Sequence, residues 1–370
     1  MGNPPQQADI ILSTARLNAI VEHAHSDLTV TVEAGCTLQH LAETLAKQIQ
    51  RLALDALWPS TATVGGILST NDSGALRLRF GSLRDLVIGA TLALADGTLA
   101  KSGGKVVKNV AGYDLPKLAV GAFGTLGVIT QATFRLHPTP IQSRTISAVA
   151  RDARDAQRLL LAIQDSKLAH SASQIRFVES QQPQLDVLFE ATEAGCNAQV
   201  DQLKSILAPA AIVDAEQAVW NARQLLCSEA TENRAGMGRS NAAPLHEPAD
   251  AAGSALARIS VLPTQIAETY ETLAGLAGAN RVRFSAVFYA IGIGTIGVTG
   301  APADITSVLQ NLRGKTESLG GWLVTIHQPD ATPRLDAWGS AGDQVALMRA
   351  VKKQFDPKST LNPGRFVGGI

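Results

Sequence analysis

Small and side-chain-poor residues recur at three junctions between apolar runs, where the backbone could lie against a large ligand. We name these junctions the first (59–66), second (69–74) and third (121–129) glycine clusters. Because glycine lacks a Cβ atom, its backbone can approach a ligand closely and turn an amide towards a pyrophosphate or a ring edge. Any one cluster has the composition of an ordinary turn. Their ordered recurrence, with a further Asn-Pro-Gly-Arg at 362–365, favours a nucleotide site.

A different glycine motif, at 292–297, matches the spacing GxGxxG that is typical of dinucleotide-binding Rossmann folds. That fingerprint requires a helix to begin at the glycines, with an acidic residue about twenty positions later. Here residues 298–302, Val-Thr-Gly-Ala-Pro, are typical of a strand end and a turn. The motif therefore predicts a glycine-rich strand or bulge, and a nicotinamide enzyme is the alternative.

Other catalytic and metal-binding patterns are weaker. His23 and His25 form an HxH pair, but no third ligand follows at a suitable spacing. His327 ends a predicted strand and is either an acid or base facing a pocket or a structural histidine. The sequence contains no GxSxG, HExxH or Walker motif, which argues against hydrolase and nucleotide triphosphatase chemistry. We identify no catalytic residue and predict no metal site.

The length and composition indicate a globular protein of two domains. At 370 residues the chain exceeds what one hydrophobic core usually serves, and 45% of its residues are hydrophobic. Thirty-two basic residues balance 32 acidic ones, so no excess positive charge is available to attract nucleic acid. Three widely spaced cysteines fit no disulfide or metal pattern and are interpreted as buried or incidental thiols: Cys36, Cys196 and Cys227.

The amino terminus lacks the charged and apolar regions of a signal peptide, and no apolar run is long enough for a membrane span. We therefore expect a cytoplasmic protein, or one held at the inner face of a membrane by a partner.

Periodicity predicts the elements that position the clusters. Residues 28–33 alternate as a half-buried strand, and Thr37 is expected to cap a helix with an apolar stripe formed by Leu38, Leu41, Leu45 and Ile49. A strand at 87–95, a turn at 96–97 and a return at 98–101 form a predicted hairpin. A strand at 128–136 is followed by His-Pro-Thr-Pro at 137–140, which we interpret as the first domain boundary.

From about residue 144 short strands alternate with amphipathic helices, which is typical of an α+β domain with helices on one face of an antiparallel sheet. Expected elements are helices around 156–163, 200–207, 266–276 and 305–312, and strands at 259–262, 281–291 and 322–326. Residues 229–254 contain almost no large apolar side chains and are predicted to form a long loop. The last segment contains a helix around 345–351.

Several motifs together resemble a known family. Thr63–Gly66, Arg79–Ser82, Ala95–Gly97, Ala111–Leu115 and Gly124–Thr130 are similar to the FAD-linked oxidases of the vanillyl-alcohol oxidase and p-cresol methylhydroxylase (PCMH) fold. Residues 108–114 and 347–369 look most like the FAD-binding subunits of bacterial glycolate oxidases. The match covers roughly 1–140 and 335–370.

The resemblance implies a two-domain, PCMH-type FAD-binding α+β fold whose second domain contains an antiparallel sheet. Residues 1–140 would form the FAD-binding domain, 141–334 the substrate domain, and 335–370 a segment returning to the FAD domain. Related chains begin with a GGGT-like loop around the diphosphate, and this chain is expected to start just after it, so that the amino-terminal FAD subdomain is truncated. The resemblance places these residues beside FAD, with Asn362 near the isoalloxazine: Pro59, Ser60, Thr63, Val64, Gly65, Gly66, Ser69, Asn71, Ser73, Gly74, Gly124, Thr125, Gly127, Val128 and Asn362.

The implied activity is FAD-dependent oxidation of glycolate or another small 2-hydroxy acid, with a second flavoprotein subunit and an iron–sulfur subunit as partners. The alternative is a flavin-free structural subunit of such a complex. Related dehydrogenases hold a metal with an HxH pair in the second domain, whereas that domain here offers only His170, His246 and His327, none so paired. Metal-assisted oxidation is therefore not expected.

The loop at 105–115 contains two lysines, an asparagine and the Tyr113 phenol. Beside a flavin, such a loop would hold a substrate carboxylate or stabilise a reduced, anionic ring. Equally, Tyr113 and Asp114 would begin and cap the next helix, with both lysines solvated.

Overall fold

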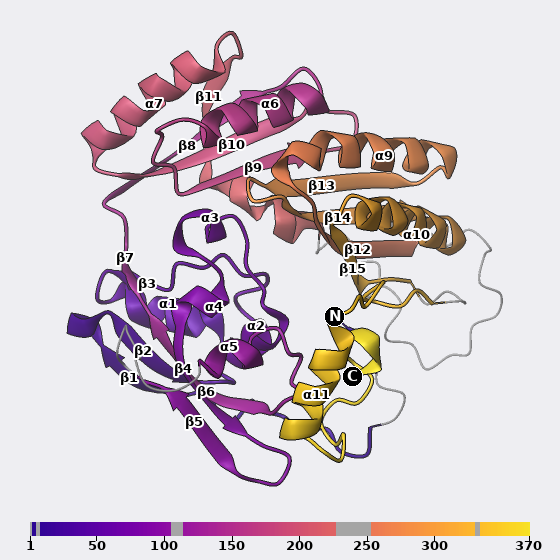
Figure 1. The fold of residues 1–370 in the computed structure, drawn as a ribbon. Helices are drawn as coiled ribbons and strands as arrows, with labels where there is room; N and C mark the ends of the chain where they lie inside the picture. The colour runs from indigo at the N-terminus through magenta and orange to yellow at the C-terminus, as the bar shows by residue number, and fades with distance from the viewer. Residues whose placement is uncertain (1, 5–7, 105–113, 227–252, 330–333) are drawn as a thin grey trace, which may run out of the picture. The chain divides into compact units, whose positions relative to one another are not determined.

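The computed structural model describes residues 2–4, 8–104, 114–226, 253–329 and 334–370. The chain divides into two compact units (Figure 1). The first unit comprises residues 2–140 together with 340–370, and the second unit comprises residues 141–339.

The first unit is built on a five-stranded sheet in the order β1-β2-β6-β4-β5, beside a two-stranded pair, β3 and β7. All of its strand pairs are antiparallel. The strands are β1 (Ile20–Ala24), β2 (Thr29–Glu33), β3 (Gln50–Arg51), β4 (Val87–Ala93), β5 (Leu99–Gly103), β6 (Val128–Arg135) and β7 (His137–Pro138). Its helical elements are η1 (His25–Asp27), α1 (Leu38–Ala46), α2 (Val64–Thr70), α3 (Arg77–Phe80), α4 (Leu83–Leu86), α5 (Pro116–Ala119), α11 (Val345–Phe355) and η4 (Val367–Gly369).

Helix α1 illustrates how the sequence determines a cap and a buried face in the first unit. Thr37 caps it as predicted, since its Oγ1 accepts a hydrogen bond from the His40 amide at 3.3 Å. Leu38, Leu41 and Leu45 are buried in the core of the first unit. The prediction for Ile49 is wrong, because the helix ends at Ala46 and Ile49 is 72% exposed. The predicted strand around residues 28–33 and the hairpin formed by β4 and β5 are confirmed.

The second unit contains an eight-stranded antiparallel sheet in the order β11-β8-β10-β9-β13-β14-β12-β15. The strands are β8 (Gln142–Val149), β9 (Ala172–Phe177), β10 (Gln184–Ala191), β11 (Ile212–Ala215), β12 (Gly253–Ser260), β13 (Arg283–Tyr289), β14 (Ile293–Gly300) and β15 (Trp322–His327). The helical elements are α6 (Ala153–Gln164), α7 (Glu193–Leu207), η2 (Gln217–Asn221), η3 (Pro263–Gln265), α9 (Ile266–Ala279) and α10 (Pro302–Ser318).

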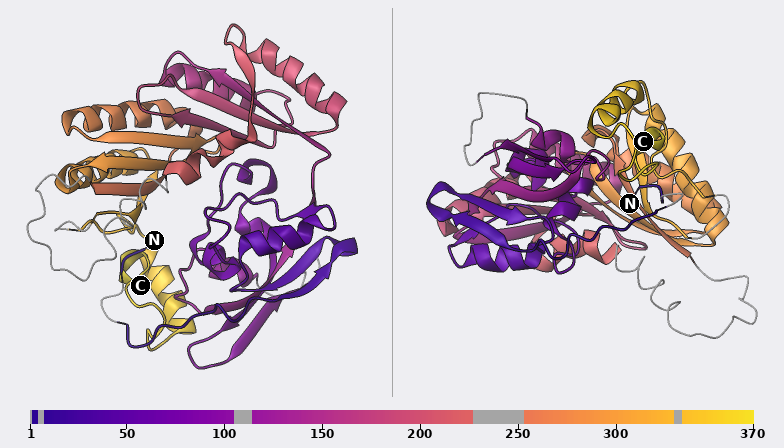
Figure 2. Two further views of the ribbon diagram at one scale, coloured as in Figure 1. Left: turned by 180° about the vertical axis from the view of Figure 1, so that it is seen from behind. Right: turned by 90° about the horizontal axis from the view of Figure 1, so that it is seen from below.

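Four helices of the second unit pack side by side on its sheet in the order α7, α6, α9, α10 (Figure 2). The alternation of side chains along the strands explains this layer. Ile175, Phe288 and Ile296 lie on one face and are buried, whereas Gln174, Arg176 and Asp186 lie on the other. The predicted α+β architecture, with helices against an antiparallel sheet, is confirmed.

Two predictions for the second unit need correction. The strand expected at 259–262 begins at Gly253 and ends at Ser260, so the end of the predicted long loop belongs to β12. The remainder of that loop, residues 227–252, lies outside the described residues.

Most of the GxGxxG motif lies in β14, where Gly294 packs under Phe288, so a Rossmann nucleotide site is excluded.

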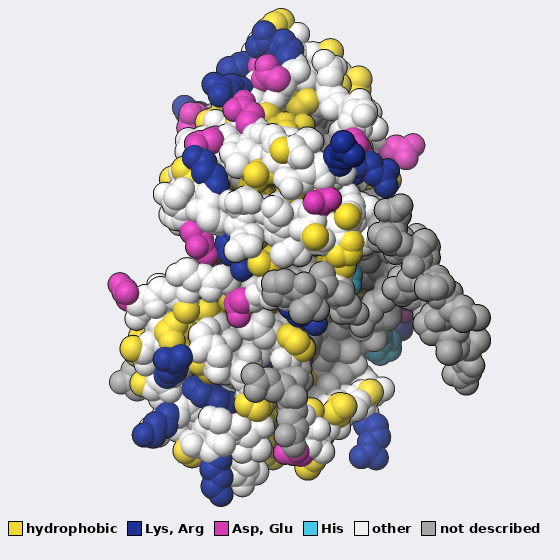
Figure 3. Space-filling model, turned by 90° about the vertical axis from the view of Figure 1, so that its right-hand side faces the viewer, with side chains coloured by type: hydrophobic (Ala, Val, Ile, Leu, Met, Phe, Trp, Pro, Cys, Tyr) yellow, Lys and Arg dark blue, Asp and Glu magenta, His cyan; other side chains and the backbone are white. Residues whose placement is uncertain are grey.

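Acidic and basic side chains are interspersed on the face drawn in Figure 3, as expected from equal numbers of the two.

One carboxylate, Asp155 at the start of α6, is buried and has two arginine partners. The Arg151 guanidinium donates to it at 3.1 Å and Arg158 at 2.8 Å. These hydrogen bonds from Arg151, with further support from Arg158, hold the pKa of Asp155 well below its usual range despite burial.

The second unit should therefore lose stability in acid. A carboxyl group whose folded-state pKa is depressed stabilises the fold above its unfolded pKa of about 4, and that contribution disappears as the pH falls through the folded pKa. We expect Asp155→Asn to cost on the order of 2 kcal/mol at pH 7 and roughly half as much at pH 2.5, where the unfolded carboxyl is protonated but the folded one is still ionised. Urea unfolding at both pH values measures this, and Asp165→Asn, at the other end of α6, is the control. An equal loss at both pH values would contradict the assignment.

Candidate functional site

Helix α2 joins the first two glycine clusters. Thr63 caps its amino-terminal end, and Asn71 forms its carboxy-terminal cap in the left-handed conformation, with φ of 51°. At 1.5 Å per residue the seven-residue helix is about 10 Å long, and its first three residues belong to the first cluster and its last two to the second. The two clusters therefore lie at opposite ends of one short helix, an arrangement that suits an elongated ligand lying along the helix.

The first cluster uses its amides within the fold. The Val64 amide donates to the Cys36 carbonyl at 2.9 Å, and the Gly65 amide donates to the Ala34 carbonyl at 2.7 Å. The Gly66 amide donates to Thr63 Oγ1 at 3.2 Å. A Cβ atom on Gly65 would lie 2.9 Å from that of Ala34. Gly65 therefore lets α2 approach β2, and the expectation that these three amides face a ligand is wrong.

A cavity of about 620 Å³ lies beside Thr63. Thr37, the cap of α1, lines the same cavity, and the two threonines form an isolated β-bridge. Each threonine oxygen already accepts an amide hydrogen bond from its own helix. Its hydroxyl proton can therefore still be donated to an oxyanion, and helix amino termini favour negative charge. Further residues line the cavity: Ser13, Thr14, Ala15, Asn18, Gly35, Cys36 and His40.

The third cluster is hydrogen-bonded to the carboxy-terminal end of α2. The Gly121 amide donates to the Leu68 carbonyl at 2.8 Å, and the Phe123 amide donates to the Ser69 carbonyl at 3.0 Å. Segments about fifty residues apart in the chain are thereby joined, so the second and third clusters form one surface of the first unit.

Asn362 completes this assembly. Its Nδ2 donates to the Phe123 carbonyl at 2.8 Å. Gly124 has φ of 69°, and a Cβ atom there would lie 2.9 Å from the same Nδ2. Glycine is required at 124 both for its conformation and for this approach. The asparagine near the carboxyl end therefore adjoins the third cluster, as the nucleotide hypothesis requires.

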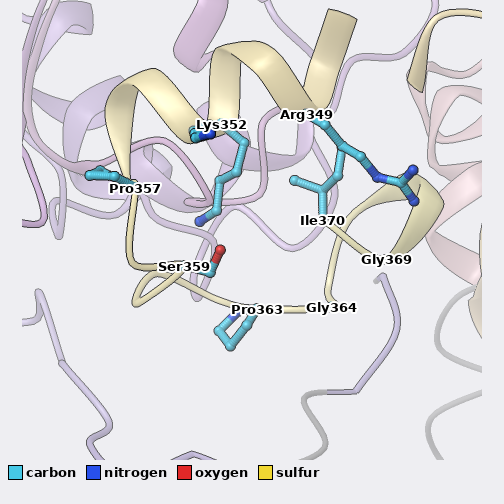
Figure 4. A pocket seen from close by; sticks show the side chains of 9 residues that line it. Arg349, Lys352, Pro357, Ser359, Pro363, Gly364, Gly369 and Ile370 are labelled. Atoms are coloured by element: carbon cyan, nitrogen blue, oxygen red, sulfur yellow. The ribbon is translucent and has the colours of Figure 1, made fainter. Parts of the chain in front are cut away.

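A buried lysine of α11 holds the same region together. Lys352 Nζ donates to the Thr125 carbonyl at 2.7 Å, to the Leu361 carbonyl at 2.9 Å and to Asp356 at 2.6 Å. Figure 4 shows Lys352 pointing from the helix towards the loop that carries Ser359 and Pro363, beside a cavity of about 320 Å³. Burial opposes ionisation of Asp356, but hydrogen bonds from Lys352 and from the Leu361 and Thr360 amides outweigh it, so its pKa is lowered.

Two aspartates that the sequence analysis missed shape the second cluster. Asp55 accepts hydrogen bonds from the amides of Gly74 at 2.9 Å and Ala75 at 2.5 Å. A side chain on Gly74 would collide with that carboxylate. Asp72, which is buried, accepts from the Leu57 amide at 2.9 Å. Both interactions tie the 55–57 segment to the second cluster, but nothing in the local sequence distinguishes these aspartates from ordinary turn residues.

The predicted residues differ in their accessibility. Pro59, Ser60, Gly66 and Asn362 are exposed, whereas Val64, Ser73, Gly74, Thr125 and Gly127 are buried. Gly127 packs against Ala93, and Val128 begins β6 opposite the same residue. These buried members support the backbone of the site. The accessible surface of the clusters is therefore formed mainly by Pro59, Ser60, Thr63, Gly66, Ser69, Asn71, Gly124 and Asn362.

Other candidate residues have structural partners or lie elsewhere. His23 Nε2 is 2.8 Å from Gln50 Oε1, and no group of three potential metal ligands occurs among the described residues. Cys36 and Cys196 are buried, as predicted, whereas Cys227 lies outside the described residues. Most of the loop at 105–115 also lies outside them. Within the described part of the chain, no helix combines the length and apolarity that a membrane crossing requires.

Comparison with known proteins agrees with this arrangement. Residues 2–103 match the FAD binding domain family, and residues 339–366 match the carboxy-terminal domain of FAD linked oxidases. Both matches fall almost entirely within the first unit. The chain also resembles solved structures of alkyldihydroxyacetonephosphate synthase, one with a TM-score of 0.71 and 16% identity over 94% of this chain and 67% of that chain.

Two curated relatives are similar over nearly the whole sequence, and a third is similar over part of it. The glycolate oxidase subunit GlcD of Bacillus subtilis is 28% identical across 98% of this chain and 80% of its own length. The D-lactate dehydrogenase of Archaeoglobus fulgidus is 26% identical across 99% and 83%. The bovine mitochondrial D-2-hydroxyglutarate dehydrogenase is 36% identical over 139 residues, which is 38% of this chain and 26% of that protein.

The fold and these matches define a flavoprotein of the PCMH type. The matched regions indicate an FAD-linked oxidoreductase with FAD as its cofactor, and the chain is similar to a glycolate oxidase subunit and to 2-hydroxy-acid dehydrogenases.

Proposed function

We propose that this protein is an FAD-binding subunit of a glycolate oxidase-like complex that oxidises a small 2-hydroxy acid. The observation that carries the proposal is the convergence of the second and third clusters and Asn362 on one end of α2, with the first cluster at the other end. Three relatives whose names specify 2-hydroxy acids support this substrate class. When bound, FAD supplies the two-electron oxidising capacity that turns a 2-hydroxy acid into a 2-oxo acid.

In this proposal the residues along α2 hold the cofactor. Thr63 and Thr37 donate their hydroxyl protons to the pyrophosphate at the 620 Å³ cavity. Gly66, which is exposed at the first turn of α2, leaves room for the ligand to pass. Because Asn362 Nδ2 donates to the Phe123 carbonyl at 2.8 Å, the third cluster and Asn362 adjoin the same part of the cofactor in this proposal, not its adenosine and isoalloxazine ends separately. Residues 1–140 and 335–370 then form the FAD domain, and residues 141–334 the substrate domain.

The proposed partners are a second flavoprotein subunit and an iron–sulfur subunit, in a complex located in the cytoplasm or at the inner face of a membrane. GlcD, named as a glycolate oxidase subunit, supports an assembly of several chains. Co-purification of the tagged chain from its native host, followed by iron and flavin analysis, tests this part of the proposal.

A substitution at Gly66 tests the cofactor site. Leucine at Gly66 would project from the exposed start of α2, where only Thr63 Oγ1 lies within 4 Å of the new Cβ atom, at 3.2 Å. We expect Gly66→Leu to reduce the flavin bound per chain at least tenfold, because the side chain occupies the ligand's path. Flavin is measured by absorbance after denaturing the purified protein.

The matched control is Gly275→Leu in α9, where an added Cβ atom meets nothing within 4 Å. Both substitutions remove a helical glycine, so Gly275→Leu should leave the thermal midpoint unchanged or slightly raised. In Gly66→Leu the Thr63 Oγ1 must shift by a few tenths of an ångström, so its midpoint is measured alongside to show that the protein remains folded. If Gly66→Leu retains as much flavin as Gly275→Leu, the first cluster does not hold the cofactor.

A flavin-free structural subunit is the second candidate. The engagement of the Val64, Gly65 and Gly66 amides within the fold favours it, because those donors are not available to a ligand. Wild-type protein that contains no flavin after purification, and takes none up from added FAD, would establish this alternative. About one FAD per chain would exclude it.

A further inference from the structure

A cluster of cationic side chains lies at the β3–β7 pair of the first unit, outside the glycine clusters. Arg51 and His137 are directly opposite each other across this antiparallel pair, so their side chains project from the same face. Phe80, at the end of α3, contacts both. Its ring centroid lies 4.8 Å from that of His137, and the Arg51 guanidinium carbon lies 5.2 Å from the Phe80 centroid.

Two more arginines belong to this group. The Arg79 guanidinium carbon lies 6.0 Å from the Phe80 centroid, and Arg79 is exposed. Arg135 is the last residue of β6, two positions before His137. We call Arg51, Arg79, Phe80, Arg135 and His137 the arginine cluster. It draws on four elements, β3, α3, β6 and β7, so its geometry is set by the fold of the first unit.

The charges around His137 are positive. Burial lowers the pKa of the His137 imidazole most, and the charges of Arg135, Arg51 and Arg79 lower it further. Three guanidinium groups close enough to act on one imidazole also repel one another. The Phe80 ring face attracts the guanidinium groups of Arg51 and Arg79 and helps to hold them here.

Two buried nitrogens of the cluster have no hydrogen-bond partner within the described part of the chain. They are Arg135 Nε and His137 Nδ1. Most buried polar atoms in native proteins are paired, and leaving one unpaired is destabilising. The cluster therefore combines accumulated positive charge with unused hydrogen-bonding capacity, and both features are relieved by an anion with several acceptor oxygens.

We propose that the arginine cluster binds a small oxyanion, a phosphate or a carboxylate group, at a site separate from the FAD site. The guanidinium groups of Arg51, Arg79 and Arg135 are the donors, because the planar fork of arginine matches the oxygen spacing of both groups. Arg79 is exposed, so it is the residue that an anion arriving from solvent contacts first. Phe80 keeps the guanidinium groups of Arg51 and Arg79 over its ring.

Titration of the purified full-length protein tests the proposal. Inorganic phosphate, pyrophosphate and citrate are added at constant ionic strength, adjusted with sodium chloride. Binding is followed by calorimetry and by the NMR signals of the imidazole of His137, assigned with His137→Asn. We expect saturable binding of at least one of these anions, with a shift of the His137 signals. The phosphate and citrate arms distinguish a phosphate ligand from a carboxylate ligand.

Substitutions distinguish a specific anion-binding site from the general attraction of anions to positive charge. Arg79→Gln should weaken binding at least tenfold, and Arg79→Lys should recover only part of it, because lysine keeps the charge and loses the fork. Arg84→Gln removes an equal charge from an exposed position nearby in the chain and should leave affinity unchanged. Equal loss in Arg79→Gln and Arg84→Gln, or no saturable binding of any of the three anions, overturns the proposal. Neither readout depends on FAD, so failure here is distinguishable from failure of the proposed function.

Discussion

Replacing Lys352 by methionine is expected to destabilise the first unit by about 3–5 kcal/mol, the usual effect of removing one partner from a buried ion pair. Lys352 is 5% exposed and Asp356 is fully buried. Methionine fills a similar volume but donates no hydrogen bond. The Asp356 carboxylate would then remain in the interior with only the Thr360 and Leu361 amides, and the Thr125 carbonyl would lose its lysine donor.

The neighbouring residue supplies the control. Lys353 is exposed on the same helix, so Lys353→Met should change the free energy of unfolding by less than about 0.5 kcal/mol. Urea unfolding measures both variants, and hydrogen exchange locates the effect. We expect faster exchange at residues 345–370 and at the third cluster in Lys352→Met alone. Equal stability of the two variants would show that the buried pair does not hold the carboxy-terminal segment in place.

The same interaction has a consequence for the cofactor. Lys352 fixes the Leu361 carbonyl immediately before Asn362, and Asn362 holds the Phe123 carbonyl. Loosening α11 should therefore disorder the contact between the carboxy-terminal segment and the third cluster. If the proposed FAD site is correct, Lys352→Met should also lower flavin content, whereas Lys353→Met should not.

The sequence predicted those parts of the fold that depend on local periodicity. Leu38, Leu41 and Leu45 recur at helical spacing, and Thr37 has a short hydroxyl side chain at the start of that run. Both the helix and its cap can therefore be predicted from the sequence. The failure at Ile49 has a local reason as well. The spacing continues beyond the helix, but the chain turns at Lys47 and leaves Ile49 exposed, which apolar spacing alone does not reveal.

The candidate site was predictable only in outline. The order of the glycine clusters identified the segments, but the contacts that join them are tertiary. Lys352 bonds to Thr125, 227 positions away, and Asp55 bonds to Gly74, 19 positions away. Neither residue has a distinctive local context. Glycines at 65, 74 and 127 serve close packing inside the unit, and sequence alone cannot separate such a glycine from one that faces a ligand.

Replacing Arg176 by methionine should have a comparably large effect on the second unit. Asp186 is fully buried in β10 and accepts hydrogen bonds from Arg176 at 2.6 Å, from Gln174 at 2.9 Å and from Ser147 at 2.5 Å. Arg176 is the only one of the three donors that carries a charge. Without it the carboxylate is buried and uncompensated, and we expect a loss of about 3–5 kcal/mol, measured by urea unfolding with hydrogen exchange at β9 and β10.

The same sheet contains the matched control. Arg144 pairs with Asp214 at 2.6 Å, but these side chains are 31% and 65% exposed. Water therefore screens the pair, and Arg144→Met should cost less than about 1 kcal/mol. The double variant Arg176→Met/Asp186→Leu should recover part of the loss of Arg176→Met, because it removes the buried charge as well as its partner. If the double variant is no more stable than Arg176→Met, packing rather than the uncompensated carboxylate determines the effect.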